Sequence, residues 1–235
     1  VAVRVDNSDQ PNSRWYSGCG IYRNVYLVET GNIHVAHWGT FVTASQNGDV
    51  NIDISIDNTY NASEKITVRN SIVDSHGRII SVASSASLAK GDTVTVNTQH
   101  LSISNPSLWS VDSPNMYLLR TELLRGKKVF DTYTTKFGFR SFKFDAASGF
   151  WLNGKNMKVK GVCLHHDAGI VGTAVPKDVW KRRLAILKAG GCNAIRTAHN
   201  PASDEFLDLC DEMGFLVQNE FYDEWDLPKD KRYNM

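Results

Sequence analysis

Residues 192–221 constrain the fold of this chain more than any other stretch. They give a short apolar strand that runs into Arg196 and His199, then an amphipathic helix, then a second apolar strand that runs into Asn219 and Glu220. Polar groups therefore gather where strands stop and loops begin. In an α/β barrel, this end of the strands carries the active site.

The residues before this stretch extend the order to β-α-β-α-β. Residues 157–165 read as an apolar strand that runs into a His-His-Asp sequence, and residues 176–190 read as a helix with a proline in its first turn and a glycine at its end. Nearly apolar strands joined by helical crossovers are typical of a parallel sheet covered on both faces. A doubly wound sheet gives the same local pattern, but the glycine-rich phosphate loop after its first strand is missing. The sequence therefore predicts the first three units of a (β/α)₈ barrel, over residues 143–235.

A complete barrel of this kind has eight units and about 250 residues, whereas the sequence stops just after the third strand. It also begins at Val1, without an initiator methionine or a signal sequence. We therefore expect the chain to be a piece of a longer protein, in which further barrel strands follow Met235.

Residues 32–142 have a different character, with short alternating runs such as 50–56, 66–68, 93–96 and 117–123. The dipeptides that separate such runs are typical of turns: Asn47-Gly48, His76-Gly77, Lys90-Gly91 and Arg125-Gly126. About seven short strands in this space predict an immunoglobulin-like β-sandwich without the cysteine pair of antibody domains. It shows no cluster of titratable groups, so we expect a structural spacer, joined to the barrel through residues 141–149.

Composition excludes several classes of partner. The formal net charge is +1 with 22% charged residues, so we expect neither a nucleic-acid nor a membrane partner. The four cysteines, Cys19, Cys163, Cys192 and Cys210, have neither disulfide-pair nor metal-finger spacing. We expect Cys163, Cys192 and Cys210 to be small buried apolar side chains. A homo-oligomer is compatible with the sequence. The compartment is not specified, with a periplasmic or extracellular location ahead of a cytoplasmic one.

One run near the start carries a more specific signal, because Trp15 is followed by Gly-Ile-Tyr-Arg-Asn-Val at residues 20–25. With residues 193–201 (Asn-Ala-Ile-Arg-Thr-Ala-His-Asn-Pro) and the later Asp211 and Gly214, it makes the chain resemble glycoside hydrolase family 2, the β-galactosidases, β-glucuronidases and β-mannosidases. The resemblance implies an all-β part followed by an α/β part. Residues 1–31 would end a jelly-roll sugar-binding domain with a strand over 20–25, residues 32–142 would be the sandwich, and 143–235 would start the catalytic barrel.

The resemblance also implies a retaining exo-glycosidase that hydrolyses terminal β-galactosides, or β-glucuronides or β-mannosides, by double displacement without a required cofactor. Such enzymes use two carboxyl groups about 5 Å apart, which the family places after barrel strands four and seven. Both are expected beyond Met235, so the chain alone should be inactive. Asn219-Glu220 matches the family's acid/base pair in type, but it follows strand three and lacks the Trp-Ser-x-Gly context. Glu220 is therefore not assigned as the catalytic acid.

Five residues are candidates for sugar binding: His165, Arg196, His199, Asn200 and Glu220. Neutral imidazoles can hydrogen-bond sugar hydroxyls, and the resemblance places both histidines in the pocket for the terminal sugar. Arg196 either orients the ligand or simply pairs with Glu220. Asn200 stands where the family usually has tyrosine. By resemblance, Glu220 and Glu224 line the pocket floor, while His166 and Asp167 read equally well as a solvated turn.

Two other classes of function fit part of the pattern. His165, His166, Asp167, His199 and Glu220 could be ligands of zinc, iron or manganese in a metal-dependent hydrolase. Amidohydrolase-like barrels, however, carry His-x-His on strand one and do not need two β modules before them. Alternatively, without its carboxyl pair, the chain could be a carbohydrate-binding or surface protein.

A divalent cation is the one cofactor that the family suggests. Some β-galactosidases of the family hold magnesium through Glu-x-His after strand three, but here Glu224 and Asp226 occupy these positions. The missing histidine makes this a weak candidate for a magnesium site.

Overall fold

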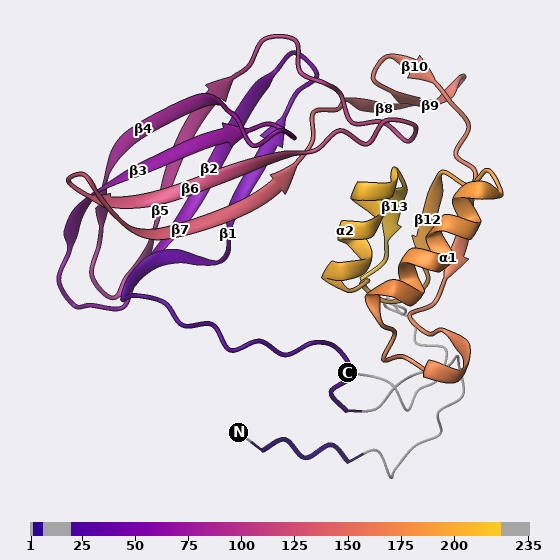
Figure 1. Ribbon diagram of the computed structural model, residues 1–235, viewed down its shortest axis with the longest axis horizontal. Coiled ribbons are helices and arrows are strands. Elements are labelled where there is room, and N and C mark those ends of the chain that lie inside the picture. Colours follow the sequence, from indigo (N-terminus) through magenta and orange to yellow (C-terminus); the bar gives the residue numbers. More distant parts are fainter. Residues whose placement is uncertain (1, 7–19, 222–235) are drawn as a thin grey trace. The chain divides into compact units, whose positions relative to one another are not determined.

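The computed structural model describes residues 2–6 and 20–221. The chain forms two compact units, Val1–Tyr26 with Lys158–Met235 and Leu27–Met157 (Figure 1). The first unit therefore joins the start of the chain to the β/α part, although the two segments are far apart in sequence. The domain boundaries near Gly31 and Phe142 stay predictions. No helix of the described residues is long and apolar enough to cross a membrane.

Unit two contains the predicted β-sandwich. One antiparallel sheet has the order β1-β2-β5 and the other the order β4-β3-β6-β7. The strands are β1 (Ile33–Ala44), β2 (Asp49–Asn58), β3 (Glu64–Val73), β4 (Ile79–Ala89), β5 (Thr93–Ser102), β6 (Tyr117–Arg125) and β7 (Lys128–Phe137). Three of the four predicted turn dipeptides lie between consecutive strands, and the fourth, Arg125-Gly126, begins on the last residue of β6. At Gly48, with φ of 94°, a Cβ atom would lie 2.0 Å from the carbonyl oxygen of Ile103, so only glycine fits.

The core of the sandwich follows from alternation along the strands. Val50, Ile52, Ile54 and Ile56 of β2 are fully buried, whereas the residues between them point outward or are less buried. Polar side chains, buried except for the half-buried Ser85, also meet between the sheets, and we call them the core polar network: Asn70, Ser85, Asn97, Gln99 and Thr121. The network joins β5 of one sheet to β3, β4 and β6 of the other.

The predicted joint over residues 141–149 is more ordered than expected. β8 (Phe142–Asp145), β9 (Gly149–Leu152) and β10 (Lys155–Asn156) form a small antiparallel sheet within unit two. Asp145 closes the turn between β8 and β9, because its Oδ1 accepts hydrogen bonds from the backbone N–H groups of Ala147 (3.0 Å) and Ser148 (2.8 Å).

The β-α-β-α-β prediction for the last part of the chain is confirmed. β11 (Gly161–Leu164), β12 (Ala194–Thr197) and β13 (Leu216–Asn219) are parallel, with α1 (Lys177–Ala189) and α2 (Asp204–Met213) as crossovers and a 3₁₀ turn at Gly169–Val171. The first strand is shorter than the predicted 157–165. The Asn193 side chain accepts a hydrogen bond from the N–H of Lys160 (2.8 Å) and donates to the carbonyl of Lys158 (3.0 Å), which takes these groups away from strand pairing.

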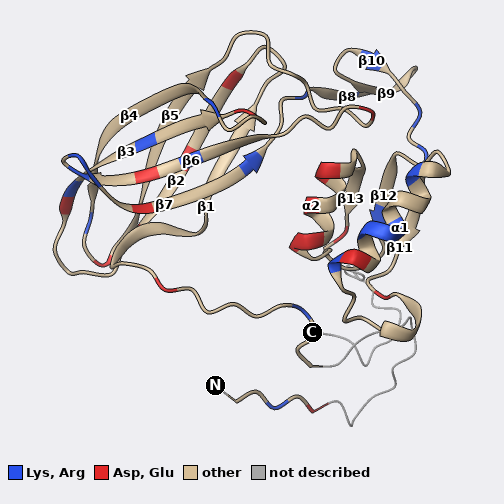
Figure 2. Ribbon diagram, viewed as in Figure 1, with Lys and Arg blue, Asp and Glu red and all other residues tan. Residues whose placement is uncertain are grey.

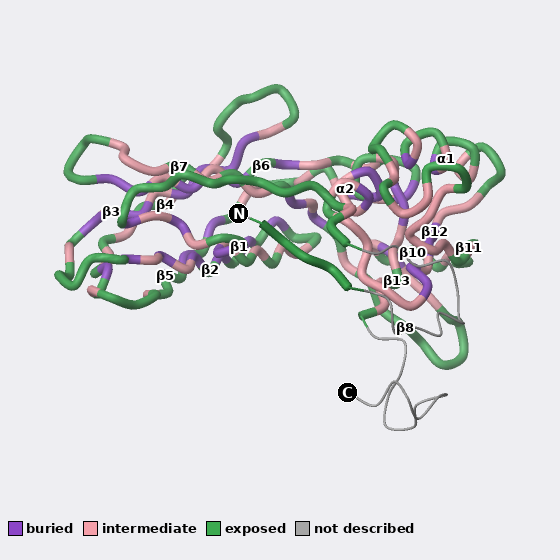
Figure 3. The backbone as a smooth tube through the Cα atoms, turned by 90° about the horizontal axis from the view of Figure 1, so that it is seen from below, coloured by how far each residue is buried: buried purple, intermediate pink, exposed green. Residues whose placement is uncertain are grey.

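The helices cover one face of this sheet. A cluster between them and the strands contains Trp180, Leu184, Ile195, Phe206 and Phe215, all nearly inaccessible. Buried stretches of the chain are purple in Figure 3. The opposite face, which points to the interior in a closed barrel, carries the exposed Cys163 and Gln218 in the part of the chain that the structure describes, and we call it the open face.

The open face corrects the expectation for the cysteines. Cys163 is exposed on it and Cys192 is half-buried, so the expected burial of both is wrong. Cys210 on α2 is buried as expected. Cys19 lies outside the described residues.

The strand that the resemblance implies over residues 20–25 is not formed. Residues 20–31 carry neither helix nor strand, and none of the described residues pairs with them as a neighbouring strand. A strand needs such a neighbour for its backbone hydrogen bonds, so this segment makes its contacts through side chains instead.

Candidate functional site

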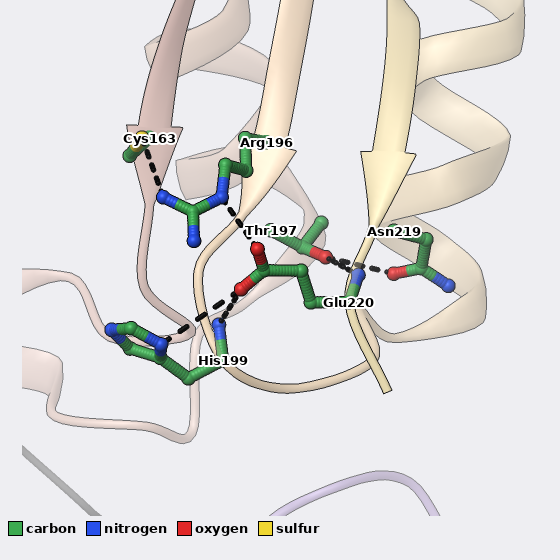
Figure 4. Close-up of polar contacts among 6 residues, drawn as sticks. All are labelled: Cys163, Arg196, Thr197, His199, Asn219 and Glu220. Carbon is green, nitrogen blue, oxygen red and sulfur yellow. Dashed lines mark hydrogen bonds and ion pairs between the residues drawn. The ribbon is translucent and has the colours of Figure 1, made fainter. Parts of the chain in front are cut away.

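Four of the five candidate residues converge at the carboxyl ends of β11–β13, and Figure 4 shows three of them, Arg196, His199 and Glu220. Arg196 Nε donates to Glu220 Oε1 at 2.5 Å, and the backbone N–H of His199 donates to Glu220 Oε2 at 2.7 Å. The rings of His165 and His199 lie 5.2 Å apart at 64°. Glu220 thus ties the end of β12 to the end of β13, and the ion pair with Arg196 that the sequence left open is formed.

The residue before Glu220 has a supporting role in this site. Asn219 Oδ1 accepts hydrogen bonds from Thr197 Oγ1 (2.9 Å) and from the N–H of Ala202 (3.2 Å). The Thr197 hydroxyl in turn accepts from the N–H of Glu220 at 2.9 Å. These bonds connect the loop after β12 to the end of β13, as Figure 4 shows for Thr197 and Asn219. Both side chains of the Asn219-Glu220 pair therefore hold neighbouring segments in place.

His199 has an unusual backbone conformation at the centre of this arrangement. Its φ is 75°, in the left-handed region that bulky residues rarely adopt. Such a conformation costs about 1–3 kcal/mol and persists where surrounding contacts enforce it, often at functional sites. Here the bond from the His199 N–H to the Glu220 carboxylate provides one such contact.

The electrostatics of the site keep Glu220 ionised. The hydrogen bond from the His199 backbone and the contact with Arg196 hold the pKa of the Glu220 carboxyl below its usual range. A general acid needs the opposite shift, toward the working pH. Glu220 is therefore an ionised acceptor for the hydrogen bonds of its neighbours, and its exclusion as the catalytic acid stays a prediction.

Asn200, the fifth candidate, lies in the wall of a neighbouring cavity. It lines a cavity of about 120 Å³ at the N-terminal ends of α1 and α2, together with His165, His166, Trp180 and Phe206. His165 is the one candidate that both lines this cavity and contacts the His199 ring. The structure therefore places the five candidates in two adjoining groups.

The turn after His165 is less solvated than a simple loop. The His166 ring is half-buried and stacks on Tyr22 at 5.7 Å with 13° between the planes. Burial and the nearby Arg23 lower the pKa of His166, because both disfavour its charged form. The carbonyl of Asp167 accepts from Arg183 Nη1 at 2.6 Å.

The described ranges, 2–6 and 20–221, contain no group of three or more His, Cys, Asp or Glu side chains that could hold a metal ion. The His-His-Asp run with His199 and Glu220 falls within these ranges and does not form such a group. Glu224 and Asp226, the positions of the magnesium alternative, lie outside the described residues.

Sequence reasoning missed one set of residues near the cavity. Arg23 Nη2 donates to the carbonyl of Pro201 at 2.6 Å, Asn24 Nδ2 donates to Glu205 Oε1 at 2.5 Å, and the Tyr26 hydroxyl donates to the same oxygen at 3.2 Å. Glu205 is on α2, which is rich in acidic residues (Figure 2). The signal in the sequence was the Gly-Ile-Tyr-Arg-Asn-Val run, which indicated a family without indicating a contact.

A β-sandwich joined to parallel β/α units, with polar side chains at the strand ends, defines a multidomain protein with a barrel-type site. Residues 33–140 match the model of glycosyl hydrolases family 2, and residues 145–224 match the model of the TIM barrel domain of that family. The chain therefore belongs to glycoside hydrolase family 2.

Individual relatives agree with this family. The chain is 48% identical over 229 residues to β-galactosidase BoGH2A of Bacteroides ovatus, covering 96% of this chain and 27% of that protein. It is 30% identical over 262 residues to a β-glucuronidase of Formosa agariphila, covering 97% and 27%. A crystal structure of a family 2 member from Bacteroides cellulosilyticus superposes with a TM-score of 0.88 at 37% identity, covering 92% and 30%. The chain thus spans less than a third of the length of these relatives.

Proposed function

We propose that this chain is part of a retaining exo-β-glycosidase that removes terminal β-galactosyl residues from oligo- or polysaccharides. The observation that carries the proposal is the convergence of His165, Arg196, His199 and Glu220 at the strand ends of a family 2 barrel segment. The 48% identity to a protein named β-galactosidase favours the galactoside. Hydrolysis would proceed by double displacement through a covalent glycosyl-enzyme intermediate.

Each residue of the site has a distinct role in this proposal. The Glu220 carboxylate holds the Arg196 guanidinium and the His199 backbone, so that the side chains beside the sugar are oriented before it binds. The imidazoles of His165 and His199, 5.2 Å apart, are spaced to meet hydroxyls of one sugar ring. Asn200 contributes from the adjoining cavity.

The two catalytic carboxyl groups are proposed to follow Met235, on barrel strands beyond the third. The reaction requires no cofactor, since proton transfer and nucleophilic attack are both carboxyl chemistry. The partner is a carbohydrate, with no nucleic-acid or membrane partner, and the enzyme is compatible with a homo-oligomer. A periplasmic or extracellular location fits a polysaccharide substrate.

The test compares the intact enzyme with the 235-residue chain on nitrophenyl β-galactoside, β-glucuronide and β-mannoside, followed by NMR of the product anomer. The expected result is galactoside hydrolysis with retention by the intact enzyme and no hydrolysis by the chain alone. Turnover by the highly purified chain would contradict the placement of the carboxyl pair. An inverted product would contradict the double displacement.

A β-glucuronidase is the second candidate, and the β-glucuronidase of Formosa agariphila is the observation that favours it. A higher kcat/KM for the glucuronide than for the galactoside would select it. An intact protein that binds galactosides without hydrolysing any glycoside would instead select the carbohydrate-binding alternative.

A further inference from the structure

We infer that residues 22–26, which we call the N-terminal clamp, hold the loops that carry the proposed sugar-binding side chains, with Arg23 as a positioning residue. The inference rests on the proposed function. The sequence predicts that the clamp residues end a jelly-roll domain. Their side chains contact residues of the β/α part.

Arg23 contacts the loop after β12. Its guanidinium donates to the carbonyl of Pro201 at 2.6 Å across 178 positions of sequence. Pro201 directly follows His199 and Asn200, and a proline has no N–H group. The carbonyl is therefore the only backbone group of Pro201 that can form a hydrogen bond. A charged donor makes a stronger hydrogen bond to such a carbonyl than a neutral one.

The other side chains of the clamp hold the surroundings of the same loop. Tyr22 stacks on His166, the residue after His165 in the loop after β11. Asn24 and Tyr26 both donate to Glu205 Oε1 at the start of α2. The backbone N–H of Glu205 itself, followed by the bonds from Asn24 and Tyr26, lowers the pKa of the Glu205 carboxyl, so it remains an ionised acceptor. One short segment thus contacts the loop after β11, the loop after β12 and the following helix.

The loop after β12 needs such support because His199 has φ of 75°. Two bonds from the barrel side fix its ends, from the His199 N–H to Glu220 and from the Ala202 N–H to Asn219. The Arg23 bond fixes Pro201 between them. Without it, Asn200 and Pro201 have more freedom, and His199 can relax toward a less strained backbone.

The clamp also forms part of the cavity wall. Tyr22, Arg23 and Asn24 line the 120 Å³ cavity together with His165 and Asn200. A displaced clamp therefore changes both the position of the loop and the shape of the adjoining space. In catalysis, displacement of a reacting group's neighbours by about 1 Å can cost up to a hundredfold in rate.

The test uses the intact enzyme with Arg23→Ala, Arg23→Lys and the control Arg182→Ala, which removes an exposed arginine from α1 of the same unit. Arg23→Ala is expected to lower kcat/KM about tenfold, mainly through kcat, because orientation is lost in the transition state. Arg23→Lys should recover part of the loss, since an ammonium can still donate to the carbonyl. Hydrogen exchange of residues 198–202 should be faster in Arg23→Ala than in Arg182→Ala.

A double-mutant cycle with His199→Ala separates positioning from general stability. If Arg23 acts through the loop that carries His199, its replacement should have little further effect on kcat in the His199→Ala background. A lower melting temperature with unchanged kinetics, or full additivity in the cycle, would overturn the positioning role. Unchanged exchange in residues 198–202 would overturn the clamp itself. A wild-type enzyme that is inactive on all β-glycosides would overturn the proposed function and the catalytic effect of the clamp. Hydrogen exchange of residues 198–202 would still test whether Arg23 holds the loop after β12.

Discussion

The core polar network offers a quantitative test of what holds the two sheets of the sandwich together. The Thr121 hydroxyl donates to Asn70 Oδ1 at 2.6 Å, and Asn70 Nδ2 donates to Gln99 Oε1 at 3.1 Å. Thr121 and Asn70 are 0% exposed and Gln99 is 7% exposed, so water cannot replace a lost bond. Thr121→Val keeps nearly the same side-chain volume and removes only the donor.

The expected cost of Thr121→Val follows from this geometry. A buried acceptor left without its donor loses about 1–3 kcal/mol relative to the satisfied state. The free energy of unfolding of the sandwich should fall by that amount, and amides that exchange only on global opening should exchange about 5- to 150-fold faster. Mass spectrometry of peptides that cover β2 and β3 measures this directly, without interference from the other unit.

Two further variants make the result interpretable. Thr134→Val changes an exposed threonine on β7 of the same sheet and should alter exchange by less than about twofold. Asn70→Leu combined with Thr121→Val removes both partners of one bond, and its cost should be less than the sum of the single costs. A Thr121→Val chain that exchanges like the wild type would refute the claim that the network stabilises the packing of the two sheets.

Three other predictions concern the site and the titratable groups. In the intact enzyme, His199→Ala should lower kcat and kcat/KM about ten- to a hundredfold through a lost hydrogen bond in the transition state, and a stable variant with wild-type kinetics would remove His199 from the site. Iodoacetamide at pH 8 should label the exposed Cys163 of the 235-residue chain well before Cys210, because burial raises the pKa of the Cys210 thiol to about 12; equal labelling rates in peptide mass spectrometry would contradict this. The Arg69 side chain lowers the pKa of the Glu122 carboxyl, so the unfolded chain takes up protons first as the pH falls. Urea midpoints of the wild type and of Glu122→Gln should therefore converge from about pH 5 downward, and parallel curves would contradict the assignment.

Much of the fold was predictable because its signals are local. The valines and isoleucines of β2 alternate with polar residues, which reports a strand with one buried face, and glycine dipeptides mark the ends of such strands. The order of strands and helices in residues 161–219 follows in the same way, from apolar periods and from caps such as Gly214, whose φ is 74°. The beginning of the first barrel strand was less predictable, because the Asn193 side chain competes for its backbone groups from 33 positions away.

The exposure of Cys163 could not be predicted from its apolar neighbours. A short parallel strand is apolar at nearly every position, so the sequence does not tell which face the helices cover. In β12, Ile195 turns to the helices and Arg196 to the open face, and the in-register partner of Arg196 in β11 is Cys163. The arginine was the one residue of the three that could have identified the open face, because a guanidinium is rarely packed under a helix.

The site illustrates the same division between local and distant information. The rule that a barrel carries its site at the carboxyl ends of its strands predicted that His165, Arg196, His199 and Glu220 lie together. Parallel neighbouring strands bring these ends to one edge of the sheet. This rule makes no prediction for residues 22–26, which show no periodic pattern. Arg23 contacts Pro201 in the loop after β12 from 178 positions away. Such a contact depends on the course of a segment without secondary structure. Helix and strand propensities do not predict that course. The sequence thus predicts where the polar strand ends meet, whereas the contact of Arg23 with the loop that carries His199 is seen only in the structure.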